Sequence, residues 1–533
     1  LTQDEALKRI LDKRTSVNPN EYIYGTLQAR AKIKVSPELD RCIRSTVHRL
    51  MQNDARAKDP GLLLGKIQCG KTNAFVNIMA LSFDRGIDIC VVFTNGVNSL
   101  STQTKERMMS DFRHFKESSD LHQPATIYIH DISELHRHGF PQAQFSRRTG
   151  TKLVIICKKE AKNLEHLTNL FEEKSPHLLD RKVLIIDDEA DFASRNYRKL
   201  HGEVSLASIS EQIDDFSKLP TYSRYLQVTA TPYSLFLQPD GMIELSNGGH
   251  AQPWRPRFTS IVPVHDRYIG GHQYFVDSRD EASMYSHLFH PISEKCIEVL
   301  GRRNKHYLSR GTESKNIEDL TDAVTSYFIG TAIRSIQEEE LGRAYQSSAL
   351  IHCDIAQKAH KWQSELIASV VNGVCRAICS RPQEERMDML IRELYHDFEQ
   401  SNKKARTQGL IDVKLPPRTA VIKRMQQIFE REDYRIYVVN SQNDVPNMLD
   451  DSGQLKLSCT ANIFIGGSIL DRGITIGKMI CFFYGRDPKK FQMDTVLQHA
   501  RMFGARDKED MAVTRFHTTP AIYQVFSHMN EID

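Results

Sequence analysis

Residues 65–72 read GKIQCGKT and combine two glycines, a lysine and a threonine at a spacing that suits a phosphate group. Gly65 and Gly70 can adopt backbone angles that turn successive N–H groups inward around phosphate oxygens. Lys71 would then reach the β- and γ-phosphates of a nucleotide, and Thr72 would offer its hydroxyl to Mg²⁺. The spacing therefore predicts a nucleotide-binding loop made of Gly65, Lys66, Ile67, Gln68, Cys69, Gly70, Lys71 and Thr72.

Both flanks of this loop suit a strand–loop–helix arrangement. The apolar run LLL at 62–64 precedes it, and the apolar-periodic segment NAFVNIMALSF at 73–83 follows it. A helix that begins directly after the loop would point the positive end of its dipole at the bound anion. The alternative interpretation is a glycine-rich turn that happens to precede Lys71 and Thr72. We disfavour it because both required flanks are present.

An apolar run that ends in carboxylates is the second candidate for chemistry. The segment KVLIIDDEAD at 182–191 has acidic residues at its carboxyl end. Ligands of parallel sheets collect at the carboxyl ends of strands, so this end can face the same phosphates as the loop. We expect Asp188 to hold Mg²⁺, usually through water, and Glu189 to orient and deprotonate the attacking water. Asp187 and Asp191 are expected to be structural or coupling residues, and a solvated acidic turn is the alternative.

Hydroxyl and guanidinium groups later in the chain complete the candidate chemistry. Thr229 and Thr231 stand at the end of the apolar run in QVTATPYS, which by itself is only a turn. Arg472 lies in FIGGSILDRGITI, and Arg501 and Arg506 lie in DTVLQHARMFGAR. An arginine from a second domain can neutralise charge that develops on a transferred phosphoryl group. Ordinary surface arginines are the alternative.

These residues need a parallel α/β framework, which the pattern of apolar runs predicts. Between 60 and 240, runs such as DICVVF, KLVIIC and KVLIID alternate with longer amphipathic stretches, as in buried parallel strands joined by crossover helices. A second alternating block begins near 346 with SALIHC. The predicted fold class is α/β with two parallel-sheet domains. The predicted parts are an N-terminal helical segment at 1–55, a first domain at 56–240, a connector or insertion at 241–345, a second domain at 346–520 with a helical insertion at about 356–430, and a tail at 521–533.

Composition indicates a cytoplasmic protein with no membrane association. The chain has 533 residues, and no stretch approaches the roughly 20 consecutive apolar residues that span a bilayer. The first dozen residues lack a signal-peptide pattern. Ten cysteines are sparse for this length, and Cys375 and Cys379 have no partner pair at zinc-site spacing. The net charge of +4 neither requires nor excludes nucleic acid, because a local basic groove is enough to bind it.

Taken in order, the motifs resemble those of superfamily 2 helicases. GKIQCGKT, VVFTNGVNSLSTQT, DDEAD, TATP, GGSILDRGIT and QHARMFGAR correspond to motifs I, Ia, II, III, V and VI. More narrowly, GGSILDRGIT, the Q-x-x-R-x-x-G-x-R spacing at 498–506, YIGGHQYF at 268–275 and SALIHCDIAQKAH at 348–360 resemble the Z-one domain family. That family comprises endonuclease-associated ATPases of bacterial restriction and phage-defence loci.

The resemblance, which covers roughly 60–520, implies an ATPase with two RecA-like domains, ATP and Mg²⁺ in the cleft between them, and nucleic acid, DNA in the first place, as the track. It implies that Lys71 and Thr72 bind phosphate and metal and that Asp188 and Glu189 are the metal and catalytic acid pair. Thr229 and Thr231 would couple hydrolysis to movement. The sensors in trans would be Arg501 and Arg506, and Arg472 would join the nucleotide site.

The chain departs from the family pattern at two positions: Cys69 stands where Ser is common, and Ala500 replaces a usual Gly. Neither change removes a catalytic group, although Cys69 could make activity sensitive to thiol reagents. Upstream of the loop we find no convincing adenine-recognising glutamine motif, so the preference for ATP rests on the resemblance. The sequence has no recognisable nuclease pattern either, so DNA cleavage is expected from a missing region or a partner, a nuclease or another defence-system protein.

Three functional hypotheses follow. The leading one is a nucleic-acid-stimulated ATPase or translocase of a restriction or phage-defence system. The second is a nucleotide-gated switch that orders a partner interface and does not translocate. The third, an intrinsic nuclease, predicts metal-dependent nicking that survives Lys71→Ala. An ATPase assay against a panel of nucleic acids separates the first two, because only the first predicts stimulation by DNA.

Overall fold

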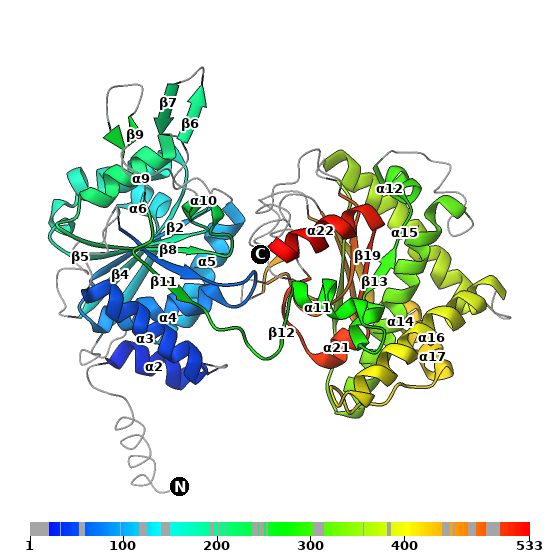
Figure 1. The fold of residues 1–533 in the computed structure, drawn as a ribbon. Helices are drawn as coiled ribbons and strands as arrows, with labels where there is room; N and C mark the ends of the chain where they lie inside the picture. Colours follow the sequence, from blue (N-terminus) through cyan, green and yellow to red (C-terminus); the bar gives the residue numbers. More distant parts are fainter. Residues whose placement is uncertain are drawn as a thin grey trace, which may run out of the picture. The chain divides into compact units, whose positions relative to one another are not determined.

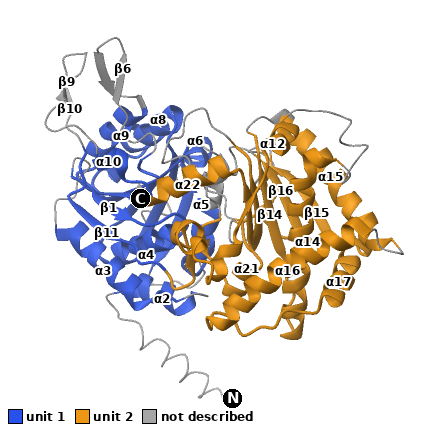
Figure 2. Cartoon of the chain, turned by 45° about the vertical axis from the view of Figure 1, so that its right-hand side comes forward, with its two compact units in different colours: residues 1–264, 451–453 blue, residues 265–450, 454–533 orange. Residues whose placement is uncertain are grey.

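The protein is divided into two compact units, which we describe from a computed structural model (Figure 1). Unit 1 comprises 1–264 with 451–453, and unit 2 comprises 265–450 with 454–533 (Figure 2). The structure describes residues 21–31, 34–52, 59–95, 98–116, 125–139, 150–191, 197–200, 203–206, 208–236, 243–244, 250–251, 254–301, 314–354, 357–380, 385–439, 448–450, 454–466, 476–486 and 502–532.

Unit 1 is built on a seven-stranded sheet in the order β11-β1-β8-β5-β2-β4-β3, in which every neighbouring pair is parallel. Its strands are β1 (Gly61–Leu64), β2 (Ile89–Thr94), β3 (Thr126–Asp131), β4 (Thr151–Lys158), β5 (Lys182–Asp188), β8 (Tyr222–Thr229) and β11 (Phe258–Ile261). Two small antiparallel pairs lie outside this sheet: β6 (Tyr197–Leu200) with β7 (Glu203–Leu206), and β9 (Ile243–Glu244) with β10 (His250–Ala251).

Helices cover both faces of this sheet, which explains why strands such as β2 and β5 contain uninterrupted apolar runs. Along β2, Cys90 and Val92 join the core on one face, whereas Val91 and Phe93 join the core on the other. The first face carries α2 (Tyr22–Arg30), α3 (Pro37–Gln52), α4 (Lys71–Asp84) and α5 (Asn98–Asp111). The second carries α6 (Ile132–His138), α8 (Ala161–Asn169) and α9 (Ser208–Lys218), seen above the sheet in Figure 1. The short α10 (Tyr233–Phe236) follows β8.

Unit 2 has its own parallel sheet of six strands in the order β13-β19-β17-β14-β16-β15. The strands are β13 (Phe289–Pro291), β14 (Ser347–His352), β15 (Tyr434–Val439), β16 (Ala461–Gly466), β17 (Met479–Tyr484) and β19 (Arg515–Thr518). The antiparallel pair β12 (Tyr268–Ile269) and β18 (Gly504–Ala505) lies beside it. The helices are α11 (Gly271–Phe275), α12 (Glu294–Gly301), α14 (Glu318–Glu340), α15 (Gln357–Cys379), α16 (Glu385–Thr407), α17 (Arg418–Glu430), α21 (Lys508–Ala512) and α22 (Pro520–Ile532).

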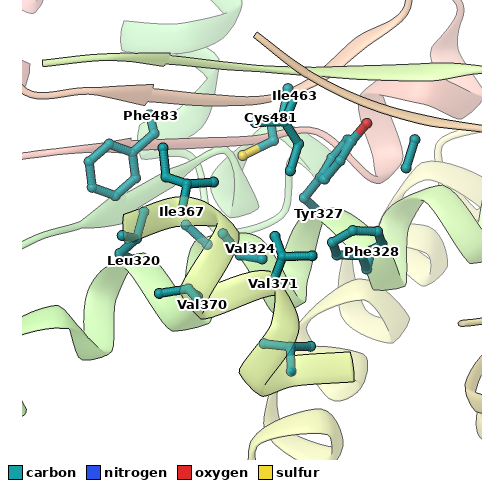
Figure 3. Packing of buried hydrophobic residues seen from close by; sticks show 14 of the residues in the cluster. Leu320, Val324, Tyr327, Phe328, Ile367, Val370, Val371, Ile463, Cys481 and Phe483 are labelled. Atoms are coloured by element: carbon teal, nitrogen blue, oxygen red, sulfur yellow. The ribbon is translucent and has the colours of Figure 1, made fainter. Parts of the chain in front are cut away.

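The core of unit 2 forms around α14, whose residues are buried on nearly all sides. Figure 3 shows Leu320 and Val324 of this helix packed with Val370 of α15 and with residues of β16 and β17. A helix with apolar and small residues all around its circumference is typical of a central position within a domain.

The two parallel α/β sheets confirm the predicted fold class, but the division of the chain differs from the predicted one. The structure divides the chain near Val264, inside the segment 241–345 that the sequence analysis set aside as a connector. Part of that segment supplies β11 to unit 1, and another part supplies β13, α12 and α14 to unit 2. The strands β11 and β13 are four and three residues long, too short to show a period. Among the described residues, no helix is long and apolar enough to cross a membrane.

Candidate active site

The loop at 65–72 connects the carboxyl end of β1 to the first turn of α4, as its flanks predict. The backbone N–H of Gly65 donates to the carbonyl of Thr229 at 3.1 Å, which attaches the start of the loop to the end of β8. At the other end, Gly70 has a φ of 100°, a left-handed conformation that a side chain would strain, and Gln68 has a φ of 56°. A Cβ atom added to Gly65 would lie 2.8 Å from the Cys69 sulfur and 2.9 Å from Cγ of Lys71. The loop is therefore a narrow cradle of backbone groups.

Lys71 folds over this cradle. Its ammonium donates to the carbonyls of Gly65 at 3.2 Å and Lys66 at 3.0 Å. Phosphate oxygens at the start of α4 would compete with these carbonyls for the ammonium group. Thr72 and Ile67 are partly exposed, whereas burial raises the pKa of the Cys69 thiol above its usual value. The residues of the loop thus suit a phosphate group, with Cys69 as a protonated thiol beneath it.

Asp188 lies at the end of β5, separated from β1 by β8 alone. Its Oδ1 accepts a hydrogen bond from the backbone N–H of Glu189 at 3.1 Å. Burial, and then the adjacent carboxylate of Glu189, raise the pKa of Asp188 to about 7, while the ammonium groups of Lys71 and Lys159 oppose this shift. Asp188 is thus within electrostatic range of the loop lysine. A divalent cation would favour the ionised carboxylate, so this donor set fits Mg²⁺.

Glu189 has an unusual backbone conformation and two polar partners. Its φ is 53°, which is uncommon for a residue with a side chain. The amide of Asn95 donates to its Oε2 at 3.0 Å, and the ammonium of Lys159 donates to its main-chain carbonyl at 2.8 Å. Non-glycine residues in this region of φ and ψ cluster at active sites and persist only where their surroundings hold them.

The other two acidic residues of the segment are bonded to the protein, in line with a structural or coupling role. Asp187 pairs with Lys159 at 2.8 Å, and both side chains are 0% exposed. It also accepts from the hydroxyl of Tyr225 at 2.9 Å. Asp191 accepts from the hydroxyls of Thr229 at 2.6 Å and Thr231 at 2.9 Å. The two threonines therefore link the end of β8 to the acidic segment after β5.

The arginines predicted in the second half lie in unit 2. Arg472 and Arg501 fall outside the described residues. Arg506 is 9% exposed, and its guanidinium donates to the main-chain carbonyl of Met479. Its backbone N–H donates to the carbonyl of Arg267 at 2.8 Å. A role for Arg506 as a sensor in trans would require its guanidinium to leave this position.

Lys159 and Asn95 were missed in the sequence analysis. Each lies two residues beyond the end of a predicted apolar run, Asn95 after DICVVF and Lys159 after KLVIIC. The rule that ligands gather at the carboxyl ends of parallel strands could have identified both residues. They were missed because the rule was applied only to the run that ends in Asp188. Asn95 lies in the segment VVFTNGVNSLSTQT, which was compared with motif Ia but given no role in the site, and Lys159 belongs to none of the motifs.

Comparison with protein families finds a match in the second half of the chain. Residues 319–533 match the Z1 domain. The matched segment begins in α14 and includes the later strands of the unit 2 sheet, whereas the loop at 65–72 and the acidic segment lie upstream of it in unit 1. None of the curated proteins shows significant similarity to the chain.

The solved structures similar to this chain include helicases and a restriction enzyme. The type ISP restriction-modification enzyme LlaBIII bound to DNA has 13% identity and a TM-score of 0.44, over 93% of this chain and 29% of that chain. The Mycobacterium smegmatis helicase Lhr, bound to ssDNA and AMP-PNP, has 12% identity and a TM-score of 0.38, over 93% and 47%. Dbp5 of S. cerevisiae, bound to RNA and ADP BeF3, has 11% identity and a TM-score of 0.41, over 93% and 91%. The chain therefore spans less than half of the first two proteins.

Proposed function

We propose that this protein is an ATP-hydrolysing motor of the superfamily 2 helicase type that serves a DNA restriction or phage-defence system. The observation that carries the proposal is the meeting, in unit 1, of a phosphate-binding loop and the Asp188–Glu189 pair at the carboxyl edge of one parallel sheet. The match of 319–533 to the Z1 domain supports the link to restriction, because the Z-one domain family that the sequence resembles comprises endonuclease-associated ATPases of restriction and phage-defence loci.

Each residue of the unit 1 site has a defined task in this proposal. The Lys71 ammonium leaves the carbonyls of Gly65 and Lys66 and binds the β- and γ-phosphates of ATP. Thr72 and Asp188 would hold Mg²⁺, which neutralises charge on the phosphates when it is bound. The Glu189 carboxylate orients the attacking water and accepts its proton.

Coupling and charge neutralisation belong to the same proposal. Thr229 and Thr231, through Asp191, would transmit the state of the nucleotide to β8. Arg501, Arg506 and Arg472 of unit 2 would contribute positive charge, so hydrolysis would change how strongly the two units hold each other. Nucleic acid, DNA first, would be the track, and a partner nuclease would cleave it. We place this system in the cytoplasm.

The test compares ATPase rates of the full chain with and without nucleic acid. Lys71→Ala is expected to abolish turnover because Lys71 is the loop lysine placed to reach the β- and γ-phosphates, whereas Lys66 is exposed at the start of the loop. Glu189→Gln is expected to lower kcat at least about 100-fold and to retain bound ATP, since removal of a general base typically costs 10²–10⁴. Wild-type turnover in both variants would refute the ATPase assignment.

A second series identifies the activator. Single- and double-stranded DNA are expected to raise the ATPase rate, and this stimulation should weaken as salt increases, because phosphate contacts release counterions. If DNA leaves the rate unchanged while a partner protein raises it, the protein is instead a nucleotide-gated switch. Metal-dependent nicking that survives Lys71→Ala would identify a nuclease.

A further inference from the structure

We propose that Lys159 and Asn95 are positioning residues for Glu189: Lys159 fixes its main chain and Asn95 fixes its carboxylate. The inference rests on the proposed ATPase function and extends it to Lys159, which lies outside the recognised motifs, and to Asn95, which lies in motif Ia and had no assigned role. Both follow strands of the unit 1 sheet, β4 and β2, and both contact the end of β5.

Lys159 reaches Glu189 across an intervening strand. In the order β5-β2-β4, the strands β5 and β4 lie two spacings apart, about 10 Å. The backbone N–H of Lys159 donates to the carbonyl of Thr94 at 2.9 Å, which fixes the base of the side chain against β2. Its ammonium then contacts both the Asp187 carboxylate and the Glu189 carbonyl, each at 2.8 Å.

The hydrogen bond from Lys159 is made to a residue with an uncommon backbone conformation. With a φ of 53°, Glu189 would relax to a more common conformation unless its peptide group were held. Lys159 holds the carbonyl of Glu189, and the N–H of Ala190 donates to the carbonyl of Val228 at 3.0 Å. The peptide that follows Glu189 is therefore fixed at both its oxygen and its nitrogen. A buried ammonium does this better than a neutral donor, because hydrogen bonds from charged groups are stronger.

Asn95 contacts the side-chain carboxylate of Glu189, whereas Lys159 contacts its main chain. Its side chain is 5% exposed and donates to Glu189 Oε2, so the carboxylate is oriented by a rigid strand end. A general base must lie within hydrogen-bond reach of the water it activates, and a misplacement of 1 Å can cost about 100-fold in rate. Fixing both the main chain and the carboxylate would meet this requirement before ATP binds.

Removing Lys159 alone would leave the buried Asp187 unpaired and could unfold the protein. The test therefore uses the double variant Lys159→Met with Asp187→Asn, which removes both charges while Tyr225 keeps an acceptor. We expect kcat to fall about 10- to 100-fold, with KM for ATP and the affinity for a non-hydrolysable ATP analogue within about threefold of wild type. A merely structural role would not separate kcat from KM in this way.

The matched control lies at the opposite end of β4. Lys152 likewise donates to a main-chain carbonyl, that of Ile87 at 2.5 Å, and pairs with Asp88 at 3.2 Å. The double variant Lys152→Met with Asp88→Asn should keep kcat within about twofold of wild type, because it lies far from the catalytic edge of the sheet. If the Lys159 pair variant folds, binds the analogue and turns over at the wild-type rate, the inference is refuted.

Asn95→Leu tests the carboxylate contact. Its control is Asn163→Leu, because Asn163 is 6% exposed and donates to the carboxylate of Glu160 at 3.2 Å outside the site. We expect a drop in kcat at unchanged KM for Asn95→Leu alone; an unchanged or increased kcat would overturn the role of Asn95. An inactive wild type, or a Glu189→Gln variant as active as wild type, would overturn the proposed function and this inference together. Failure of the positioning variants in an active enzyme overturns the inference alone.

Discussion

At Gly65, the absence of a side chain lets the loop backbone pack closely against the side chain of Lys71. A methyl group there would lie 2.8 Å from the Cys69 sulfur, 2.9 Å from Cγ of Lys71 and 3.1 Å from Cβ of Val262. The Lys71 side chain would have to move. We therefore expect Gly65→Ala to weaken ATP binding at least about tenfold, roughly 1.4 kcal/mol, as measured with a fluorescent ATP analogue.

Gly301→Ala is the control for that substitution, because an added Cβ at Gly301 meets no atom within 4 Å. It should leave the affinity for ATP unchanged. Equal affinities for Gly65→Ala and wild type would contradict the tight fit of the loop. At this scale the sequence predicted the loop and the acidic pair, because their chemistry follows from residue type and spacing. It did not identify Lys159 or Asn95, because the strand-end rule was applied only to the run that ends in Asp188, and their contacts with Glu189 depend on which strands are neighbours.

At the scale of elements, α14 carries a carboxyl group that destabilises unit 2 at neutral pH. Burial, and then the carboxylates of Glu318, Asp319 and Glu393, raise the pKa of Asp322 from 3.8 to about 7, and Arg386 only partly opposes them. Between about pH 4 and pH 7 the unfolded chain has lost this proton while the folded chain keeps it. Stability therefore falls as the pH rises through this window.

Asp322→Asn mimics the protonated carboxyl group and should remove this pH-dependent loss of stability. We expect the variant to be more stable than wild type at pH 8, by roughly 1–3 kcal/mol given 1.36 kcal/mol per pKa unit, and nearly equal to it at about pH 4, where the unfolded chain also keeps much of the proton. Urea denaturation at the two pH values measures the difference. An equal effect at both pH values would show that packing, and not ionisation, dominates at Asp322.

The elements that the sequence predicted well are those with a simple hydrophobic pattern. The strands β2, β4 and β5 each contain an uninterrupted apolar run, because helices cover both of their faces. By contrast, α14 is buried on nearly all sides and lacks the one-sided pattern by which a surface helix is recognised. The short strands β11 and β13 lie at the edges of their sheets, and their pairing depends on the rest of the fold.

At the scale of the whole molecule, each unit has its own parallel sheet and its own core. The two halves of the proposed site therefore differ in how they can be predicted. The loop and the acidic pair share one sheet, so the strand order is enough to bring them together. The proposed action of Arg501 on the same phosphates depends on closure of unit 2 upon unit 1, which no residue pattern specifies.

The two tryptophans of the chain make this closure measurable. Trp254 is buried in unit 1 at 1% exposure, and Trp362 is buried in unit 2 at 2%. Trp362→Phe and Trp254→Phe variants therefore report the unfolding of each unit separately by fluorescence. Two separate transitions are expected without nucleotide, because the two cores are distinct.

A non-hydrolysable ATP analogue with Mg²⁺, at 100 times its Kd, should stabilise unit 1 by about 2.7 kcal/mol. That energy raises the Trp254 midpoint by roughly 5–10 °C for a unit of this size. If Arg501 reaches the phosphates, the Trp362 midpoint rises as well, and Arg501→Ala removes this second rise while it leaves the first. Lys71→Ala should remove both. A Trp362 midpoint that does not respond to the analogue would mean that nucleotide is held by unit 1 alone, and the motor mechanism would then lose the closure on which it depends.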